Sequence, residues 1–363
     1  MIVFICSEPT PQNERDGLMQ RVTAIDSAFE GQERTILSLS FFGNQRRKIF
    51  RRSPVLTVEY LNVMLHWPRI AWLARRASAV YVHTCNQAFR ILPLYFMLRN
   101  IVTDLHGALV EEIAMEGKRF ACWRYRHIER IVVKRSAALV YVTHALKTHI
   151  ENKYRTVEGS AWVVPVFSKL PPPPEDMARN EDLAIYAGGL QSWQCIDEML
   201  TTAVKTQDRL RFLFLTGHPE ALQRRAAAAG LKARIESTPW SELPGQYAQA
   251  AMGFVLRDDS VVNAVACPTK LIEYLHFGVV PVVKLEQIGD FPLHDYQYIK
   301  VADLVQGRIP SLQEMEAARI KNRIIVEAMA ADSREQLERL VRAASSGTIC
   351  AHVSKPGHVA VDN

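Results

Sequence analysis

The chain has 363 residues, of which 48% are hydrophobic and 23% charged, and its formal net charge is +6. At about 100–200 residues per domain, this length predicts two globular domains with ordinary hydrophobic cores. The sequence contains no run of about 20 uncharged apolar residues, so it predicts no transmembrane helix.

The cysteines indicate a reducing environment. All six are scattered, with neither a C-x-x-C pair nor the spacing of a zinc site, so we expect no disulfide and no bound metal. The apolar residues 2–6 lack the basic region that precedes a signal peptide. We therefore expect a cytoplasmic protein.

The first 40 residues predict the start of a doubly wound α/β sheet. Residues 2–6 are an apolar run typical of a buried strand, and a loop rich in turn residues follows up to Gly17. Residues 18–29 have the apolar spacing of a helix, and residues 35–39 predict the next strand. In such sheets ligands bind at the carboxyl ends of the strands, which is where this loop is expected.

Basic residues cluster in the first half of the chain. The densest run contains Arg46, Arg47, Lys48, Arg51 and Arg52. It fits an anionic lipid surface, a nucleic acid or a phosphate, or it is a solvated loop. No RNA-binding motif accompanies it, which argues against a nucleic-acid module. Further clusters nearby favour a membrane surface.

The residues that follow, 55–74, have the apolar spacing of a helix.

Two titratable residues are expected at the carboxyl end of a strand over residues 101–105. These are Asp104 and His106, and they lie where α/β sheets bind ligands. A lone histidine is usually structural, but a carboxylate such as Asp104 commonly orients a functional imidazole. The acidic pair Glu111 and Glu112 either joins this site or begins a helix.

A run of four prolines at residues 171–174 predicts an extended, semi-rigid linker. It divides the chain into a first domain and a second domain, followed by a helix and a mobile polar tail. The predicted boundaries are 1–170, 171–182 for the linker, 183–320, 321–342 for the helix and 343–363 for the tail. The helical region itself is predicted to begin at residue 312 and to continue to residue 342.

Two glycine turns follow expected strands of the second domain. Gly188 and Gly189 come directly after an apolar strand at residues 183–187, and Gly217 ends the strand at residues 211–215. A strand followed by glycines and a helix is a candidate phosphate cradle.

The most informative stretch is a buried strand that ends at Arg257 and leads to a helix opening at Pro268 and Thr269. Helix N-termini carry a partial positive charge, so Lys270 in the first turn opposes the helix dipole unless an anion lies between them. Glu273, one turn later on the same face, is placed to accept hydrogen bonds from sugar hydroxyls. The alternative is that Lys270 and Glu273 form an exposed helix pair.

The pattern Pro268-Thr269-Lys270-x-x-Glu273-Tyr274-x-x-x-Gly278-x-x-Pro281-Val282-Val283 resembles the donor-binding signature of group-1, retaining glycosyltransferases. It is similar to those of bacterial capsule and exopolysaccharide biosynthesis, and residues 104–107 and 186–197 add weaker matches. The resemblance implies an α/β GT-B fold, with two Rossmann-like doubly wound domains facing across a cleft. It also implies that the C-terminal helix over residues 321–342 packs back on the first domain. Many members carry a second glutamate where this chain has Val265.

The resemblance also implies roles for residues. Arg257 and Lys270 would meet the donor diphosphate, Glu273 would hold the ribose, and His106 with Asp104 would act near the sugar and the acceptor hydroxyl. The remaining donor-side residues would be Gly188, Gly189, Gly217, Pro268 and Thr269, with Gly17 and the basic run from Arg46 to Arg52 on the acceptor and membrane side.

These features predict a metal-independent glycosyltransferase without a cofactor. Its donor would be a UDP- or GDP-linked sugar, and its acceptor a lipid-linked saccharide of surface polysaccharide synthesis. We expect it to bind the anionic inner face of the plasma membrane peripherally, and not nucleic acid. The alternatives are a related enzyme such as a nucleotide-sugar epimerase, or a non-catalytic GT-B protein that serves as a binding partner.

Overall fold

The computed structural model describes residues 1–10, 17–155, 160–165, 170–174 and 178–349. The chain forms two compact units. Unit 1 contains Met1–Pro165 together with Ser333–Asn363, and unit 2 is Val166–Asp332. The return of the C-terminal segment to the first unit agrees with the expected packing of the C-terminal helix, while the division points, after Pro165 and before Ser333, differ from the predicted boundaries at residues 170 and 320.

Unit 1 is built on an eight-stranded sheet of order β3-β4-β2-β1-β5-β6-β7-β8. Every neighbouring pair is parallel except β3 and β4, which are antiparallel. The strands are β1 Ile2–Ile5, β2 Arg34–Ser40, β3 Lys48–Arg51, β4 Leu56–Asn62, β5 Ala79–His83, β6 Ile101–Leu105, β7 Ala138–Tyr141 and β8 Ser160–Val163. The helices are α1 Gly17–Ala28, α2 Trp67–Arg76, α3 Thr84–Arg90, α4 Leu94–Met97, α5 Leu109–Met115, α6 Arg119–Arg135 and α7 His144–Tyr154.

The predicted helix over residues 55–74 is wrong in its first half. Leu56–Asn62 is strand β4, which pairs with β2 in parallel register from Arg34 opposite Leu56 to Ser40 opposite Asn62. Val58 and Leu61 are buried in the sheet. The conformation of this segment is therefore set by its pairing with β2 and not by the spacing of its apolar residues. Part of the basic run is also ordered as the exposed edge strand β3.

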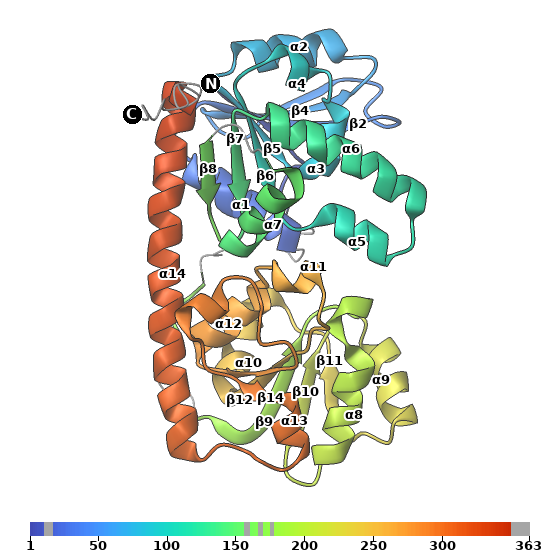
Figure 1. Cartoon of the computed structure of the whole chain (residues 1–363), viewed down its shortest axis with the longest axis vertical. Helices are drawn as coiled ribbons and strands as arrows, with labels where there is room; N and C mark the ends of the chain where they lie inside the picture. Colours follow the sequence, from blue (N-terminus) through green and yellow to red (C-terminus); the bar gives the residue numbers. More distant parts are fainter. Residues whose placement is uncertain (11–16, 156–159, 166–169, 175–177, 350–363) are drawn as a thin grey trace, which may run out of the picture. The chain divides into compact units, whose positions relative to one another are not determined.

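Unit 2 contains a six-stranded parallel sheet of order β11-β10-β9-β12-β13-β14 (Figure 1). Its strands are β9 Asn180–Ala187, β10 Arg211–Leu215, β11 Arg234–Glu236, β12 Ala250–Val255, β13 Val280–Val283 and β14 Ile299–Lys300. Its helices are α8 Ile196–Thr206, α9 Pro219–Ala228, α10 Leu243–Gln249, α11 Val261–Ala264, α12 Thr269–Phe277, α13 Val301–Val305 and the first part of α14 Leu312–Ser346. Short 3₁₀ turns lie at Ser192–Gln194, Trp240–Glu242 and Phe291–His294.

Both faces of the unit 2 sheet are buried. Alternate residues of β9 point to opposite faces, so Tyr186 packs with α8 and α9 while Ile185 packs with α10 and α12. Figure 1 shows α8 and α9 on one side of this sheet and α10 and α12 on the other. Helices on both faces explain why these parallel strands read as continuous apolar runs.

The structure revises the predicted linker and tail. β9 begins at Asn180, so the end of the predicted linker over 171–182 is already a strand, and residues 175–177 lie outside the described residues. α14 extends over residues 312–346, so helical structure begins at residue 312 as predicted and ends beyond the predicted residue 342. Leu340 and Ala344 are buried in the unit 1 core, whereas residues 350–363 of the predicted tail lie outside the described residues.

Candidate functional site

The first cluster of predicted residues surrounds the topological switch point of unit 2. The chain leaves β9 toward β10 and leaves β12 toward β13, so the strand order reverses between β9 and β12. Parallel sheets bind ligands in the crevice outside the carboxyl ends of such a strand pair. Gly188 directly follows β9 and Arg257 lies two residues after β12, so the fold brings these two predicted residues to one place.

Lys270 and Arg257 form a cationic pair without a carboxylate partner among the residues that the structure describes. The Lys270 ammonium lies 3.8 Å from the centre of the Tyr186 ring and donates a 3.3 Å hydrogen bond to Gln194. Arg257 donates to the Asn263 side chain at 3.4 Å, and its buried Nε has no hydrogen-bond partner in the parts of the chain that the structure describes. Burial and the neighbouring Arg257 charge lower the pKa of Lys270 well below its ordinary value. An anion at this point would relieve both effects.

The start of α12 reinforces the positive potential. The helix begins at Thr269, with Pro268 as its N-cap in an extended conformation, so the predicted opening is correct within one residue. Pro268 is buried and has no N–H, which leaves the first N–H groups of the helix from Thr269 onward. The Lys270 ammonium in this first turn adds its positive charge to the partial positive charge of the helix N-terminus at the same place.

The glycines of this site differ in what their geometry requires. A Cβ at Gly188 would lie 2.7 Å from the Lys270 Nζ, so a side chain there would displace the ammonium. A Cβ at Gly189 would collide with the Gln191 side chain, and the Gly189 carbonyl accepts a 2.5 Å hydrogen bond from Tyr186. Gly217 follows β10, but a Cβ there would meet nothing within 4 Å. At the first two glycines a Cβ would therefore displace the ends of the Lys270 and Gln191 side chains, whereas at Gly217 it would displace nothing.

Glu273 is buried and hydrogen-bonded, so the alternative of an exposed helix pair is wrong. Its side chain is 5% exposed, and its carboxylate accepts a 2.8 Å hydrogen bond from the Tyr247 hydroxyl. Burial raises the pKa of Glu273 to about 7, although the Tyr247 hydrogen bond and the Lys270 charge act in the opposite direction. Tyr247 and Tyr186 were missed by sequence reasoning, because both read as ordinary core aromatics.

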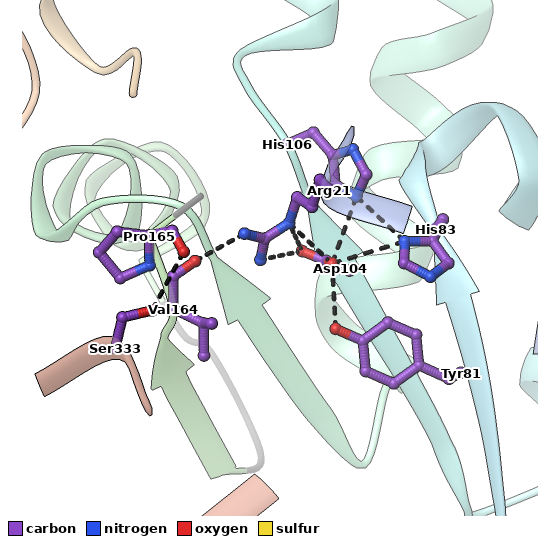
Figure 2. Close-up of polar contacts among 8 residues, drawn as sticks. All are labelled: Arg21, Tyr81, His83, Asp104, His106, Val164, Pro165 and Ser333. Atoms are coloured by element: carbon purple, nitrogen blue, oxygen red, sulfur yellow. Dashed lines mark hydrogen bonds and ion pairs between the residues drawn. The ribbon is translucent and has the colours of Figure 1, made fainter. Parts of the chain in front are cut away.

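The second cluster lies at the carboxyl ends of β5 and β6 in unit 1 (Figure 2). Asp104 is fully buried and its carboxylate accepts hydrogen bonds from Arg21 at 2.7–3.0 Å and from Tyr81 at 3.0 Å. The His106 Nε2 lies 3.3 Å from the same carboxylate and 3.3 Å from the His83 Nδ1. The predicted orientation of His106 by Asp104 is thus present in the geometry.

The Arg21 charge decides the electrostatics of this cluster. Arg21 and His106 hold the pKa of Asp104 well below its usual range despite burial, so the carboxylate stays ionised. Burial lowers the pKa of His83 to about 3 and also lowers the pKa of His106. Both imidazoles are therefore neutral near pH 7. His106 is the member that reaches the surface, with 13% of its side chain exposed against 1% for His83.

Sequence reasoning found two members of this cluster and missed Arg21, Tyr81 and His83. Arg21 lies 83 residues from its partner in the sequence, and it also donates to the Val164 carbonyl at 2.6 Å. Its position in a buried helix face carries no local signal for an ion pair. His83 does carry a usable signal, because it ends strand β5. β5 and β6 are parallel neighbours, so the carboxyl end of β5 lies beside Asp104.

Among the described residues, two groups of side chains have metal-type ligand atoms within 4.8 Å of one another. In the group of His83, Asp104 and His106, the Arg21 guanidinium already occupies both carboxylate oxygens. In the group of Cys195, Glu198 and Asp258, the Lys284 ammonium lies 2.6 and 2.7 Å from the two carboxylates. A cation of the chain itself therefore lies against each group: Arg21 balances the one carboxylate of the first, and Lys284 is shared by the two carboxylates of the second.

The predicted membrane-side residues are only partly free. Arg47 forms a 3.1 Å ion pair with the buried Glu59, and Arg52 pairs with Glu8 at 2.7 Å. Of this basic run, Arg46, Lys48 and Arg51 have exposed side chains and no carboxylate partner in the described parts of the chain. Gly17 is the first residue of α1, and its preceding loop, residues 11–16, lies outside the described residues.

Within the described residues, no helix is long and apolar enough to span a bilayer.

Comparison with known proteins shows the fold. No protein-family profile matches the sequence, and no curated protein matches it either. Solved structures do match. The α,α-trehalose 6-phosphate synthase of Burkholderia multivorans aligns with 96% of this chain and 99% of its own, at a TM-score of 0.69 and 11% identity.

Two further structures carry bound ligands. The UDP-forming α,α-trehalose-phosphate synthase of Burkholderia xenovorans, in complex with glucose-6-phosphate, has a TM-score of 0.61 and 11% identity, covering 94% of this chain and 99% of its own. Anabaena HepE in complex with UDP-glucose has a TM-score of 0.56 and 12% identity, covering 97% of each chain. The chain therefore has the predicted α/β architecture of the GT-B glycosyltransferases, while identities this low show the fold alone.

Proposed function

We propose that this chain is a retaining glycosyltransferase that uses a nucleotide-diphosphate sugar as donor. The observation that carries the proposal is the pair of Lys270 and Arg257, two cations without a carboxylate partner in the described residues, at the switch point of a parallel sheet. Such a site is built for a strongly anionic group next to a helix start. A diphosphate fits the chemistry of this pair.

The proposed reaction breaks the bond between the anomeric carbon and the donor phosphate oxygen and forms a bond to an acceptor hydroxyl oxygen. Charge accumulates on the departing diphosphate, so fixed positive groups aimed at it lower the barrier. Lys270, Arg257 and the first N–H groups of α12 would supply that stabilisation. We propose on this basis that no metal and no further cofactor is needed.

Glu273 would accept hydrogen bonds from the ribose hydroxyls. The UDP-forming synthase and the HepE complex with UDP-glucose support a uridine donor over a guanosine donor. His106 would act at the sugar or acceptor hydroxyl, because it is the most accessible member of its cluster, with 13% of its side chain exposed, and is neutral near pH 7. A neutral imidazole can accept a hydrogen bond from a hydroxyl, and Asp104 would position its ring.

For the acceptor we propose a lipid-linked saccharide in surface polysaccharide synthesis, with the protein bound peripherally to the inner membrane face. The exposed cations Arg46, Lys48 and Arg51 support this assignment. A phosphorylated sugar is the second candidate, because the Burkholderia xenovorans structure holds glucose-6-phosphate. Val265, in place of the second glutamate of many relatives, favours a non-catalytic protein and keeps that alternative open.

The direct test is turnover. UDP-glucose and GDP-mannose are incubated with the protein and either glucose-6-phosphate or membrane-extracted lipid-linked saccharides, and nucleoside diphosphate release is measured. We expect release with a uridine donor, and product of unchanged anomeric configuration. His106→Asn should lower turnover by about 10²–10⁴-fold if the imidazole assists proton movement.

The matched control is Lys284→Met, a nearby lysine whose charge is already engaged by Glu198 and Asp258. Lys270→Met should abolish release, and the control should retain it. Equal loss in both variants would contradict the assigned role of Lys270. Nucleotide binding without turnover on any acceptor would favour the non-catalytic alternative.

A further inference from the structure

Acidic residues are almost absent from one long segment of unit 1. Between Glu33 and Asp104 the only carboxylate is that of Glu59, against eleven arginines and lysines. Glu59 is 2% exposed and is held by Arg47 at 3.1 Å and Arg69 at 2.7 Å. The whole chain has a net charge of +6, so the remainder of the sequence is net acidic. Positive charge is therefore concentrated on the surface that this segment forms.

The same segment exposes large apolar side chains at one place. Phe42 is 93% exposed, Met64 73% and Leu65 63%, and we call these three residues the apolar tip. They lie on the two loops that follow β2 and β4, and these strands are parallel neighbours with Ser40 opposite Asn62. Single exposed apolar residues are common on protein surfaces, but several of them together usually mark an interaction site.

A single buried side chain holds the two tip loops together. Asn62 is 4% exposed, and its amide donates to the carbonyls of Phe41 and Gly43, both at 2.9 Å. Its oxygen accepts from the backbone N–H groups of Met64 at 3.0 Å and Leu65 at 3.1 Å. Four hydrogen bonds to one side chain fix the backbone on which all three apolar side chains are presented to solvent.

Cations lie on the loop that follows Phe42 and along the edge strand β3, where Lys48 is opposite Tyr60 and therefore nearer the tip than Arg51, which is opposite Thr57. Arg46, Lys48 and Arg51 follow Phe42 on the loop and on the edge strand β3, all exposed, with Ile49 and Phe50 between them at 51% and 41% exposure. On α2, the Arg69 and Arg76 guanidiniums stack on the half-exposed Trp72 at 4.6 and 4.9 Å. Mixed basic and aromatic surface of this kind matches the boundary between anionic headgroups and acyl chains.

We infer that this surface docks on an anionic phospholipid bilayer, with the apolar tip inserted below the headgroups and the cations of β3 and its loop at headgroup level. Charge complementarity selects this partner, because every exposed ionised side chain between Glu33 and Asp104 is basic. The docking itself does not depend on catalysis.

The tip lies at the same end of the unit 1 sheet as the cluster that contains His106. β2, β4, β5 and β6 are parallel strands of one sheet, so the tip lies at the same sheet edge as His83 and Asp104. A bilayer held at that edge would present a lipid-borne acceptor on the side of the sheet where His106 reaches the surface. This last step rests on the proposed function.

The experiment is vesicle co-sedimentation of the full chain. Phosphatidylcholine vesicles with and without phosphatidylglycerol are compared for the wild type and for a tip variant carrying Phe42→Ser, Met64→Ser and Leu65→Ser. Its matched control carries Leu293→Ser, Ile320→Ser and Ile324→Ser, three unit 2 residues that are 73%, 54% and 61% exposed. We expect binding only with phosphatidylglycerol, weakened about tenfold or more in the tip variant and unchanged in the control.

The contribution of the basic side chains to vesicle binding is tested with a second pair of variants. Arg46→Ser, Lys48→Ser and Arg51→Ser together should weaken binding roughly a hundredfold at low salt. The control, Lys205→Ser, Arg224→Ser and Lys232→Ser, removes three exposed cations of unit 2 and should bind like the wild type. UDP affinity of the tip variant, measured in parallel, should equal that of the wild type, so a failed donor site and a failed membrane surface give different results.

Three outcomes would overturn the inference. One is absence of wild-type binding to anionic vesicles. Another is equal loss of binding in a variant and its control. The third is a lipid-free dimer, seen by sedimentation velocity, that the tip substitutions dissociate while vesicle binding is absent, because the tip would then contact a second copy of the chain.

Discussion

Glu273 illustrates how a single buried residue connects folding to ligand binding. Its carboxyl group is removed from water, which raises its pKa to about 7 from an ordinary value of 4.5. The fold therefore favours the protonated form, whereas a ribose-binding role requires an acceptor of hydrogen bonds. Tyr247 and Lys270 both favour the ionised form, and they are the two groups that prepare Glu273 for the proposed role.

This linkage predicts a pH dependence of stability. Because the folded-state pKa of Glu273 is raised, its stabilising effect is present below pH 4.5 and is lost as the pH rises through about 7. The melting temperature of the wild type, relative to Glu273→Gln, should therefore fall between pH 4.5 and 7 and then level off. Tyr247→Phe should shift this window to higher pH, because it removes a hydrogen bond that lowers the pKa. A difference that stays constant with pH would contradict the buried environment of Glu273.

The same ionisation should govern donor binding. UDP affinity, measured by titration calorimetry, is expected to increase as the pH rises through about 7, because the carboxylate is then available to the ribose hydroxyls. Glu273→Gln should bind UDP weakly, with this part of the pH dependence absent. Tight binding by Glu273→Gln at every pH would exclude the ribose-holding role while leaving the cationic pair untouched.

Among the elements, α12 depends on close contact with β12. Tyr274 of α12 is fully buried and its ring covers the backbone of Gly253, where a Cβ would collide with the ring. The helix ends at Gly278, whose φ of 70° is in the left-handed region that glycine adopts without strain. The contact at Gly253 fixes the distance of α12 from the sheet, and with it the position of Lys270 and Glu273.

Gly253→Ala should therefore destabilise the protein by about 1–3 kcal/mol, the usual effect of overpacking a core. It should also weaken UDP binding, because α12 must move to admit the new methyl group. Gly217→Ala is the matched control, since a Cβ there meets nothing within 4 Å, and we expect its effect to stay within about 0.5 kcal/mol. Urea-unfolding midpoints measure both. Similar stability of the two variants would argue against the close contact.

Elements whose signals are local could be predicted from the sequence. The helix at 269–277 is bracketed by Pro268 and Gly278, and its bounds were found within one residue. β4 was mistaken for a helix, because its pairing with β2 is not visible in the apolar spacing of residues 55–74. The partners of Asp104 and Glu273 were missed for the same reason. Arg21 and Tyr247 lie 83 and 26 residues away in the sequence, and only the fold brings them into contact.

At the scale of the whole molecule, each unit places its polar cluster at the carboxyl ends of neighbouring parallel strands. In unit 1 these are β5 and β6, and in unit 2 they are β9 and β12. The GT-B architecture accounts for that repetition, because each unit is a doubly wound sheet with one ligand-binding edge. The basic surface and apolar tip belong to unit 1, and Lys270 and Arg257, which have no carboxylate partner within the described part of the chain, belong to unit 2.

The central claim is that unit 2 binds a nucleoside diphosphate through Lys270 and Arg257. The most direct measurement is the melting temperature of the full chain with UDP, GDP, ADP and CMP, for the wild type, Lys270→Met and the control Lys284→Met. A ligand at about 100 times its dissociation constant adds about 2.7 kcal/mol, which raises a melting temperature by several degrees. We predict a shift with UDP that Lys284→Met retains and Lys270→Met loses. Absence of a shift with every nucleotide would contradict the donor site and favour a GT-B protein that does not bind donors.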